Sequence, residues 1–322
     1  MKLRSLCLGL IWCFTQAVMA GGELVRVFPT DEQMTAEDFA VTRAKQIRFY
    51  RGHFYLLDQG EHGVHLFDFH GNYQKQFGRL GEGPGEMAFP HWMTAGEGSL
   101  FVVDQSSHIH EFTLDGRFLK KIPVIDFFFR FEYIDSRFFM VTLNPRSDFA
   151  YATFDRGFEK IKSFRDRLPE PTKIPIQDNR LHLSVDDGLI YILQQYGAGF
   201  RVLQPNGQMV AKGNTAVSPL DDPNYDDRWI FPTFAAYQGH FVANIVDRGH
   251  LALMVFSQAG ALVKRIRIPL ALPEVKPSEK LYFIDMTIFP HQGNHYLAAA
   301  LLAPISTVVL VRLDLDWPES RP

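Results

Sequence analysis

The sequence predicts an all-β fold, a six-bladed β-propeller of four-stranded antiparallel blades, and three observations support this prediction. Short runs rich in β-branched and aromatic residues alternate with Gly, Asn or Asp turns, and no long stretch shows the 3.6-residue period of a helix. One pair of such runs recurs six times along the chain. A glycine-rich stretch at residues 79–90, which suits neither a helix nor a strand, separates the first copy from the second.

The repeated pair of runs is predicted to form the second and third strands of each blade. Its six copies span residues 54–68, 100–113, 137–155, 189–203, 240–256 and 295–313. A turn glycine follows each of the first five copies, with spacings of 41 to 53 residues, at Gly71, Gly116, Gly157, Gly207 and Gly260. Because a four-stranded propeller blade takes about 40–50 residues, this period predicts six blades.

First and fourth strands are expected to complete the blades. Runs such as 45–50 and 92–95 precede a repeated pair, and runs such as 73–77 and 118–122 follow one. The sixth copy leaves no room for a fourth strand before the C-terminus. We therefore expect residues 23–28, a strand-like run near the N-terminus, to pair with the last blade and close the ring, which removes two exposed sheet edges.

The glycine-rich stretch is predicted to be a tight crossover loop between blades one and two. Pro84 fixes its own φ, and Gly83 and Gly85 are expected to adopt backbone conformations that a β-carbon would penalise. A phosphate-binding loop is disfavoured, because no Lys-Ser/Thr pair follows and Glu82 and Glu86 would repel phosphate.

The N-terminus has the pattern of a secretory signal peptide. A basic start, a short apolar run and small residues at the −3 and −1 positions predict cleavage after Ala20. Residues 21–322 are then expected to form a single secreted or periplasmic domain with no integral membrane segment. Both cysteines, Cys7 and Cys13, fall within the segment removed, so we expect no disulfide and no thiolate zinc site.

Composition agrees with a folded, secreted domain. Hydrophobic residues make up 46% of the chain, and its 29 phenylalanines suit packed sheets. The formal net charge of −3 argues against non-specific binding of nucleic acid, which requires a basic surface.

One segment resembles a known family. The run Gly81-Glu82-Gly83-Pro84-Gly85-Glu86, followed by the strand pattern of residues 100–112 and by Asp115-Gly116, looks like an NHL repeat. It is more similar still to bacterial secreted six-bladed β-propeller proteins with a glycine-rich loop. The resemblance is strongest over residues 78–122, extends to blade one, and holds only in outline for blades three to six. It implies the fold, secretion and a tendency to bind or scaffold. NHL-like propellers include protein binders, RNA binders, sensor domains and a few lyases, so the fold does not fix the function.

Acidic residues and histidines suggest candidate sites. Asp58 and Asp104 end the second strands of blades one and two, where an Asp is expected to cap the following turn. His62, His91 and His108 are expected on one rim of the ring, where converging imidazoles would bind a divalent metal or act as acid/base groups. No metal-binding spacing supports this, so ordinary surface or core histidines are favoured. The acidic run 221–228 lacks the spacing of a calcium-binding loop, so a solvated loop is favoured there.

These observations favour a binding, sensing or scaffold module over an enzyme. The expected partner is a protein segment or small ligand that docks on the rim of inter-blade loops, with no cofactor. The predicted ligand-binding residues, all polar or aromatic and on such loops, are Gln59, His62, Arg79, Glu86, His91, Gln105, His108, Arg146, Gln195, Tyr196 and Arg248. The alternative is a metal-assisted lyase or lactone hydrolase that uses histidines and acids at the mouth of the central channel.

Overall fold

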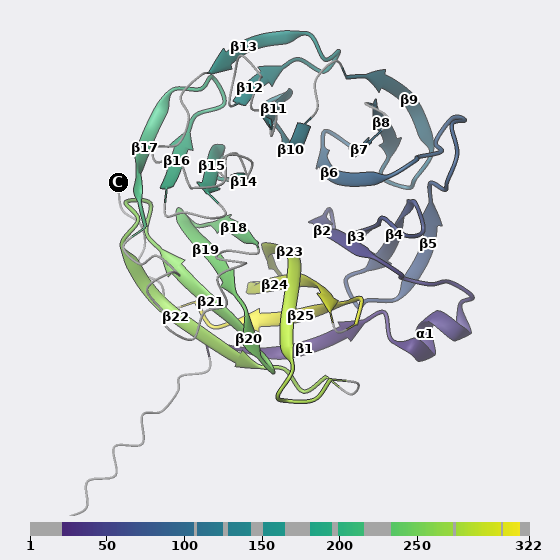
Figure 1. Ribbon diagram of the computed structural model, residues 1–322, viewed down its shortest axis with the longest axis vertical. Helices are drawn as coiled ribbons and strands as arrows, with labels where there is room; N and C mark the ends of the chain where they lie inside the picture. The colour runs from purple at the N-terminus through teal and green to yellow at the C-terminus, as the bar shows by residue number, and fades with distance from the viewer. Residues whose placement is uncertain are drawn as a thin grey trace, which may run out of the picture.

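A computed structural model describes residues 21–105, 108–124, 128–142, 151–164, 181–194, 199–215, 233–272, 275–303 and 305–315. Six antiparallel sheets are arranged as blades around one axis, and the first strand of each blade lies innermost (Figure 1). This arrangement confirms the six-bladed β-propeller and its four-stranded blades.

The strands follow one another outward in each of the first five blades. Blade 1 consists of β2 (Ala44–Tyr50), β3 (His53–Asp58), β4 (Gly63–Asp68) and β5 (Tyr73–Phe77). Blade 2 consists of β6 (Pro90–Gly96), β7 (Ser99–Asp104), β8 (His108–Thr113) and β9 (Phe118–Pro123). Blade 3 consists of β10 (Phe128–Ile134), β11 (Arg137–Thr142), β12 (Tyr151–Phe154) and β13 (Lys160–Phe164). Blade 4 consists of β14 (Leu181–Asp186), β15 (Leu189–Gln194), β16 (Gly199–Leu203) and β17 (Met209–Asn214). Blade 5 consists of β18 (Phe234–Tyr237), β19 (His240–Ile245), β21 (His250–Phe256) and β22 (Leu262–Pro269).

The sixth blade closes the ring with a strand from the other end of the chain. It contains β23 (Lys280–His291), β24 (Asn294–Ala303), β25 (Thr307–Leu313) and, outermost, β1 (Gly22–Phe28). The two-residue strand β20 (Asp247–Arg248) pairs with the start of β23. Because β1 is antiparallel to β25 from Gly22 opposite Leu313 to Phe28 opposite Val308, the predicted closure by an N-terminal strand is confirmed.

One short helix, α1 (Asp31–Ala36), follows the closing strand and lies beside blade 1 (Figure 1). Thr30 and Gln33 form a capping box at its N-terminus, which satisfies two backbone N–H groups. The Gln33 Nε2 group also donates to the carbonyl of Gly71 at 3.1 Å, and this bond ties the helix to the turn between β4 and β5.

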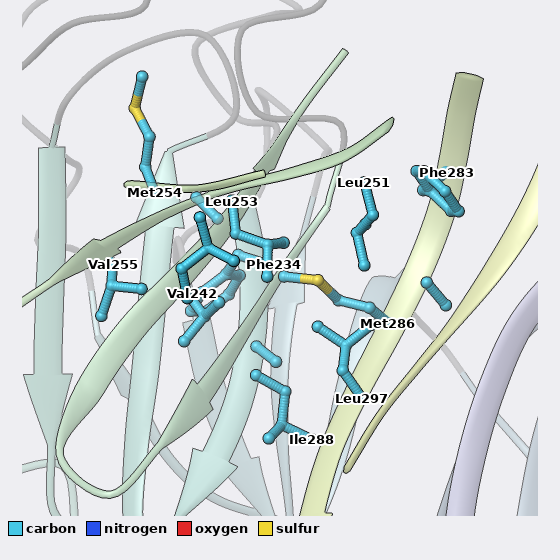
Figure 2. Packing of buried hydrophobic residues seen from close by; sticks show 14 of the residues in the cluster. Phe234, Val242, Leu251, Leu253, Met254, Val255, Phe283, Met286, Ile288 and Leu297 are labelled. Carbon is cyan, nitrogen blue, oxygen red and sulfur yellow. The ribbon is translucent and has the colours of Figure 1, made fainter. Parts of the chain in front are cut away.

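The hydrophobic core lies in layers between neighbouring blades. The middle strands are apolar on both faces because each blade has a neighbour on either side; in β7, for example, all six residues are buried. The largest cluster joins blades 4, 5 and 6. Figure 2 shows its side chains from β18, β19 and β21 meeting those from β23 and β24, with Phe234, Leu251, Met286 and Leu297 among them. Smaller clusters fill the junctions of blades 1 and 2, 2 and 3, 3 and 4, and 6 and 1.

Polar side chains on the innermost strands connect each blade to the next. Apart from the start of β23, which pairs with β20, the inner edge of each first strand has no strand beside it, so its N–H groups need other partners. At four junctions, a side-chain oxygen of one blade accepts a hydrogen bond from the next innermost strand: Asp285 Oδ2 from Ile47 (3.1 Å), Gln46 Oε1 from Met93 (2.5 Å), Thr94 Oγ1 from Tyr133 (3.1 Å) and Ser184 Oγ from Ala236 (2.9 Å). The ring is therefore held together at its axis by hydrogen bonds as well as by apolar packing.

Every outermost strand is interrupted by a β-bulge near its start or middle. The register shifts in β5, β9, β13, β17, β22 and β1 where each pairs with its inner neighbour. A bulge twists an exposed edge and makes it a poor template for pairing with another chain. The edges of all six blades are thus protected from edge-to-edge association.

Candidate functional site

The glycine-rich crossover, residues 78–89, closes on itself. The Arg79 guanidinium contacts Glu86 Oε1 through Nε at 2.8 Å and Nη2 at 2.7 Å. The N–H of Gly83 donates to Glu86 Oε2 at 2.9 Å, and the N–H of Met87 donates to the Arg79 carbonyl at 2.8 Å. Met87 is fully buried beneath the loop. The loop is therefore a defined crossover, as its composition predicts.

The two glycines singled out in this loop differ in their backbone. Gly85 has φ +77°, which favours glycine, and an added Cβ would lie 3.2 Å from the Phe118 Cβ. Gly83 is absent from the positive-φ residues, so the expectation that it adopts a conformation reserved for glycine is wrong. Its small size matters for another reason, because a Cβ there would lie 2.9 Å from the Glu86 Oε2 atom that caps its own N–H.

Two large apolar side chains of this loop are exposed to solvent. Leu80 is 63% exposed and Phe89 is 50% exposed. The ring of His62, from the neighbouring loop of blade 1, lies against Phe89 with a centroid distance of 5.3 Å. The hydrogen bond from the Gly83 N–H and, to a smaller extent, the Arg79 guanidinium lower the pKa of Glu86. The Glu86 carboxylate therefore stays ionised at neutral pH and keeps its contacts with Arg79 and Gly83. The loop thus presents apolar groups from a fixed backbone.

Asp58, at the end of β3, caps the following turn, as predicted. Asp104, at the end of β7, accepts a hydrogen bond from the N–H of Ala88 at 3.3 Å, and the turn after Asp104 lies largely outside the described residues. Asp58 Oδ1 accepts hydrogen bonds from the N–H groups of Gly60 (2.8 Å) and Glu61 (3.2 Å), which caps the turn. A buried histidine lies beside each aspartate: His65 Nε2 is 3.7 Å from Asp58 Oδ2, and His110 Nε2 is 3.1 Å from Asp104 Oδ2.

Burial raises the pKa of Asp58, but His65 and the surrounding backbone N–H groups outweigh burial, so its pKa is lowered. An ionised carboxylate committed to these partners has no capacity left for an external ligand.

The predicted ligand-binding residues that the structure describes occupy one end of the ring but have different surroundings. The strand order places the inter-blade loops and the loops between second and third strands at this end, which we call the rim. Gln59 is buried, and its Nε2 donates to the Pro90 carbonyl at 3.2 Å, so it links blades 1 and 2. Gln105 and Arg248 are exposed. Arg79 and Glu86 form an ion pair, and the Arg79 side chain is nevertheless 79% exposed.

Other residues of the predicted site are not brought together. Arg146, Gln195 and Tyr196 lie outside the described residues. Among the described residues, no three His, Cys, Asp or Glu side chains lie close enough to hold a metal ion. His62, His91 and His108 all fall within that part of the chain, so the structure does not support the less favoured interpretation of these imidazoles as a metal site. Each sits on a separate loop or strand start, and their common rim does not bring them within reach of one another.

Four charged side chains that no sequence pattern singles out gather at the axis: Arg130, Glu132 and Asp285 are buried, and Arg48 is half-buried. Arg48 of β2 donates through Nη2 to Glu132 Oε1 at 2.6 Å and through Nη1 to Asp285 Oδ2 at 3.0 Å. It thereby joins blade 1 to blade 6 and, across blade 2, to blade 3. The guanidinium of Arg130 lies 4.3 Å from the ring centroid of Trp92, and that of Arg48 lies 5.2 Å from it.

Burial dominates the electrostatics of this cluster. Burial raises the pKa of Glu132 and of Asp285, and the neighbouring arginines only partly oppose this. Burial also lowers the pKa of Arg130 to about 10. For Arg48, burial lowers the pKa, but Glu132 and Asp285 outweigh burial and raise it. The cluster balances two positive with two negative groups, so it ties blades together without a net charge to attract an ion.

Solved structures of other proteins share this fold. No curated protein matches the sequence. The fold is similar to that of a candidate exported protein from Bacteroides fragilis NCTC 9343, with a TM-score of 0.60 and 12% identity over 91% of this chain and 94% of that one. The WD40 β-propeller domain of Doa1 has a TM-score of 0.53 and 11% identity over 90% of this chain and 97% of that one. Virginiamycin B lyase from Staphylococcus aureus has a TM-score of 0.51 and 8% identity over 85% of this chain and 96% of that one. At these identities the similarities show the fold alone.

The described part of the chain contains no helix long and apolar enough to cross a membrane.

The sequence profile of DUF5128, a family described as a 6-bladed beta-propeller, matches residues 33–197, just over half of the chain. The blades built from those residues have the architecture that this description requires. The chain therefore belongs to the DUF5128 family of six-bladed β-propellers.

Proposed function

We propose that this propeller is an exported binding module that docks a protein segment on its rim, centred on the glycine-rich crossover. The observation that carries the proposal is the exposure of Leu80 and Phe89 on a loop that is held closed by Arg79 and Glu86. Large apolar side chains at the centre of a contact, surrounded by polar groups, are typical anchors for a protein partner. A loop that is already ordered loses little conformational freedom when it binds.

Neighbouring residues supply the polar surroundings that such a contact needs. His62 packs against Phe89, and Gln105 is exposed beside it, since its N–H donates to the Phe89 carbonyl at 3.2 Å. Arg79 remains largely exposed although it is paired. A segment with apolar residues and an acidic or carbonyl-rich flank fits this surface. The alternative of a metal-assisted lyase or lactone hydrolase has no comparable support, because its histidines do not group.

A photo-crosslinking residue at position 80 tests the docking proposal. We expect a specific adduct with a protein from the exported fraction, and we expect Phe89→Ser in the same chain to abolish it. The matched control carries the photo-crosslinker at Leu119, an outer-strand side chain that is 41% exposed and lies away from the rim. Equal adducts at both positions, or none at position 80, would contradict the proposal.

Export is tested separately. Residues 1–20 have the pattern of a signal peptide, and the similar fold from Bacteroides fragilis belongs to a candidate exported protein. We expect the mature protein to begin at Gly21, which intact-mass measurement of the exported fraction would detect. A protein that retains Met1 in the cytoplasm would refute export without bearing on the docking site.

A further inference from the structure

The circumference of the ring carries charge of one sign. The six outermost strands contain ten Lys or Arg residues and a single acidic residue, Glu23, although the whole chain has 33 basic and 36 acidic residues. The ten basic residues, which we call the outer belt, are Arg26, Lys75, Lys120, Lys121, Lys160, Lys162, Lys212, Lys264, Arg265 and Arg267. Every blade contributes at least one of them.

Most of this charge faces solvent. Eight of the ten residues are exposed, and Lys121 and Lys264 are half-buried. Some of them also form ion pairs with inner residues, for example Lys120 with Glu111 at 3.5 Å and Arg267 with Asp247 at 2.6 Å. Acidic residues do occur in turns at the ends of outer strands, but Asp68 and Asp155, for example, accept hydrogen bonds from their own turns.

Protection of the sheet edges explains charge on these strands but not its uniform sign. Lysines on an edge strand discourage pairing with another chain, and the bulges serve the same purpose. A glutamate would repel an identical edge equally well, and mixed signs would avoid repulsion within the ring. Ten positive charges against one negative charge therefore point to a partner that is itself negative.

We propose that the outer belt binds an acidic polysaccharide that runs around the circumference. The basic residues recur on all six blades, so an elongated, flexible chain can contact many of them, whereas a flat membrane would reach one or two blades. Single-stranded nucleic acid would call for exposed aromatic platforms. The large exposed apolar side chains on these strands are all aliphatic: Val25, Leu119, Ile161 and Val210. The belt is separate from the rim, so binding at one leaves the other accessible.

Two charge-matched triple variants test this proposal. The belt variant is Lys75→Gln/Lys212→Gln/Arg265→Gln, which removes exposed charges from blades 1, 4 and 5. The control variant is Arg43→Gln/Arg51→Gln/Lys276→Gln, which removes three exposed charges that lie off the outermost strands. Binding of each purified protein to immobilised polygalacturonate is measured at low and high salt, with polyphosphate, neutral dextran, anionic phosphatidylglycerol vesicles and single-stranded DNA as further probes.

We expect the unaltered protein to bind polygalacturonate but not neutral dextran, and to release it as salt screens the charges. The belt variant should bind more weakly, by up to about tenfold, because each exposed ion pair contributes modestly. The control variant should bind like the unaltered protein. Equal weakening by both variants would show that net charge alone is responsible and would overturn the proposal. Tighter binding to vesicles, polyphosphate or DNA than to polygalacturonate would overturn it as well. Thermal unfolding of both variants confirms that they are folded.

Discussion

Replacing Arg48 by Met removes the positive charge that neutralises two buried carboxylates. Met has a similar length and fills the space beside Trp92, so the change acts mainly on charge. Glu132 Oε1 and Asp285 Oδ2 lie 2.6 and 3.0 Å from the guanidinium, and each would lose a charged donor. At an effective dielectric constant of about 20 and about 4 Å between the centres of charge, one such pair is worth about 4 kcal/mol before desolvation is subtracted.

The net loss should be smaller than the sum of the two pairs. Removal of Arg48 also removes the cost of burying its guanidinium, and Arg130 remains near both acids. Breaking a buried pair on one side costs about 3–5 kcal/mol, which is a large part of the 5–15 kcal/mol of a typical domain. We therefore expect Arg48→Met to lower the free energy of unfolding by about 3–5 kcal/mol. Arg51→Met, an exposed change in the next turn, should stay within about 0.5 kcal/mol.

The pH dependence of this loss has a definite sign. Burial already raises the pKa of Glu132 and Asp285, and Arg48 opposes that rise. Without Arg48 both pKa values rise further, so the folded state binds protons that the unfolded state does not. Stability of the variant should then increase as the pH falls from about 8 toward about 5, and its deficit relative to the unaltered protein should shrink.

Urea unfolding at both pH values measures the effect, with Trp92 beside the cluster as a fluorescent reporter. Adding Glu132→Gln to Arg48→Met leaves one acid, Asp285, with one base, Arg130, and should restore much of the stability. A loss below about 1 kcal/mol, or a loss that is the same at both pH values, would refute the assignment of the cluster as a charge-balanced tie between blades.

Three further predictions concern the blades and loops. A chain without β1, residues 22–28, should melt at a lower temperature and aggregate, because β25 becomes an open edge; unchanged light scattering on heating would disprove closure as a source of stability. Gly85→Ala should cost about 1–2 kcal/mol because of its positive φ, and Gly83→Ala should cost less because only the end of the Glu86 side chain must move; equal losses in urea unfolding would contradict this. Asp58→Asn should cost about 2–3 kcal/mol at pH 7, since it weakens charge-assisted hydrogen bonds. Because the pKa of Asp58 is lowered, that contribution is present above about pH 4 and is lost as the pH falls through the folded-state pKa, so the two proteins should converge in acid.

Local patterns were enough to predict the architecture. The strand runs, the turn glycines and the missing fourth strand of blade six are features of short segments, and they lead to the ring and to its closure by residues 23–28. Asp58 was interpreted correctly for the same reason, since the turn that it caps begins at the next residue.

The sites depend on partners that the sequence does not bring together. Arg48 and Asp285 are 237 residues apart and meet only because the first and last blades are neighbours in the closed ring. Arg48 lies in β2 and Glu132 in β10, and neither strand has a sequence pattern that distinguishes these residues from ordinary polar strand positions. The sequence suggests Arg79 and Glu86 as separate polar groups of a binding surface, and it does not show that the loop folds back so that they also bind each other. An ion pair across a loop has no fixed sequence spacing, unlike a pair of residues on one face of a helix.

The polar residues of the innermost strands follow from the closure of the ring. Apart from the start of β23, which pairs with β20, an innermost strand has a pairing partner on one side only, and the edge that faces the axis must find other acceptors for its N–H groups. Gln46, Thr94, Ser184 and Asp285 supply these acceptors from the preceding blade. Once such groups are concentrated at the axis, a buried charge among them can be stabilised, and Arg48 links three blades in this way. Polarity at the axis of this protein is therefore explained by the needs of the scaffold, and it does not by itself indicate a ligand. The scaffold does not explain two surfaces: the exposed apolar residues Leu80 and Phe89 of the crossover loop, and the basic outer belt. Binding should be sought at these two surfaces.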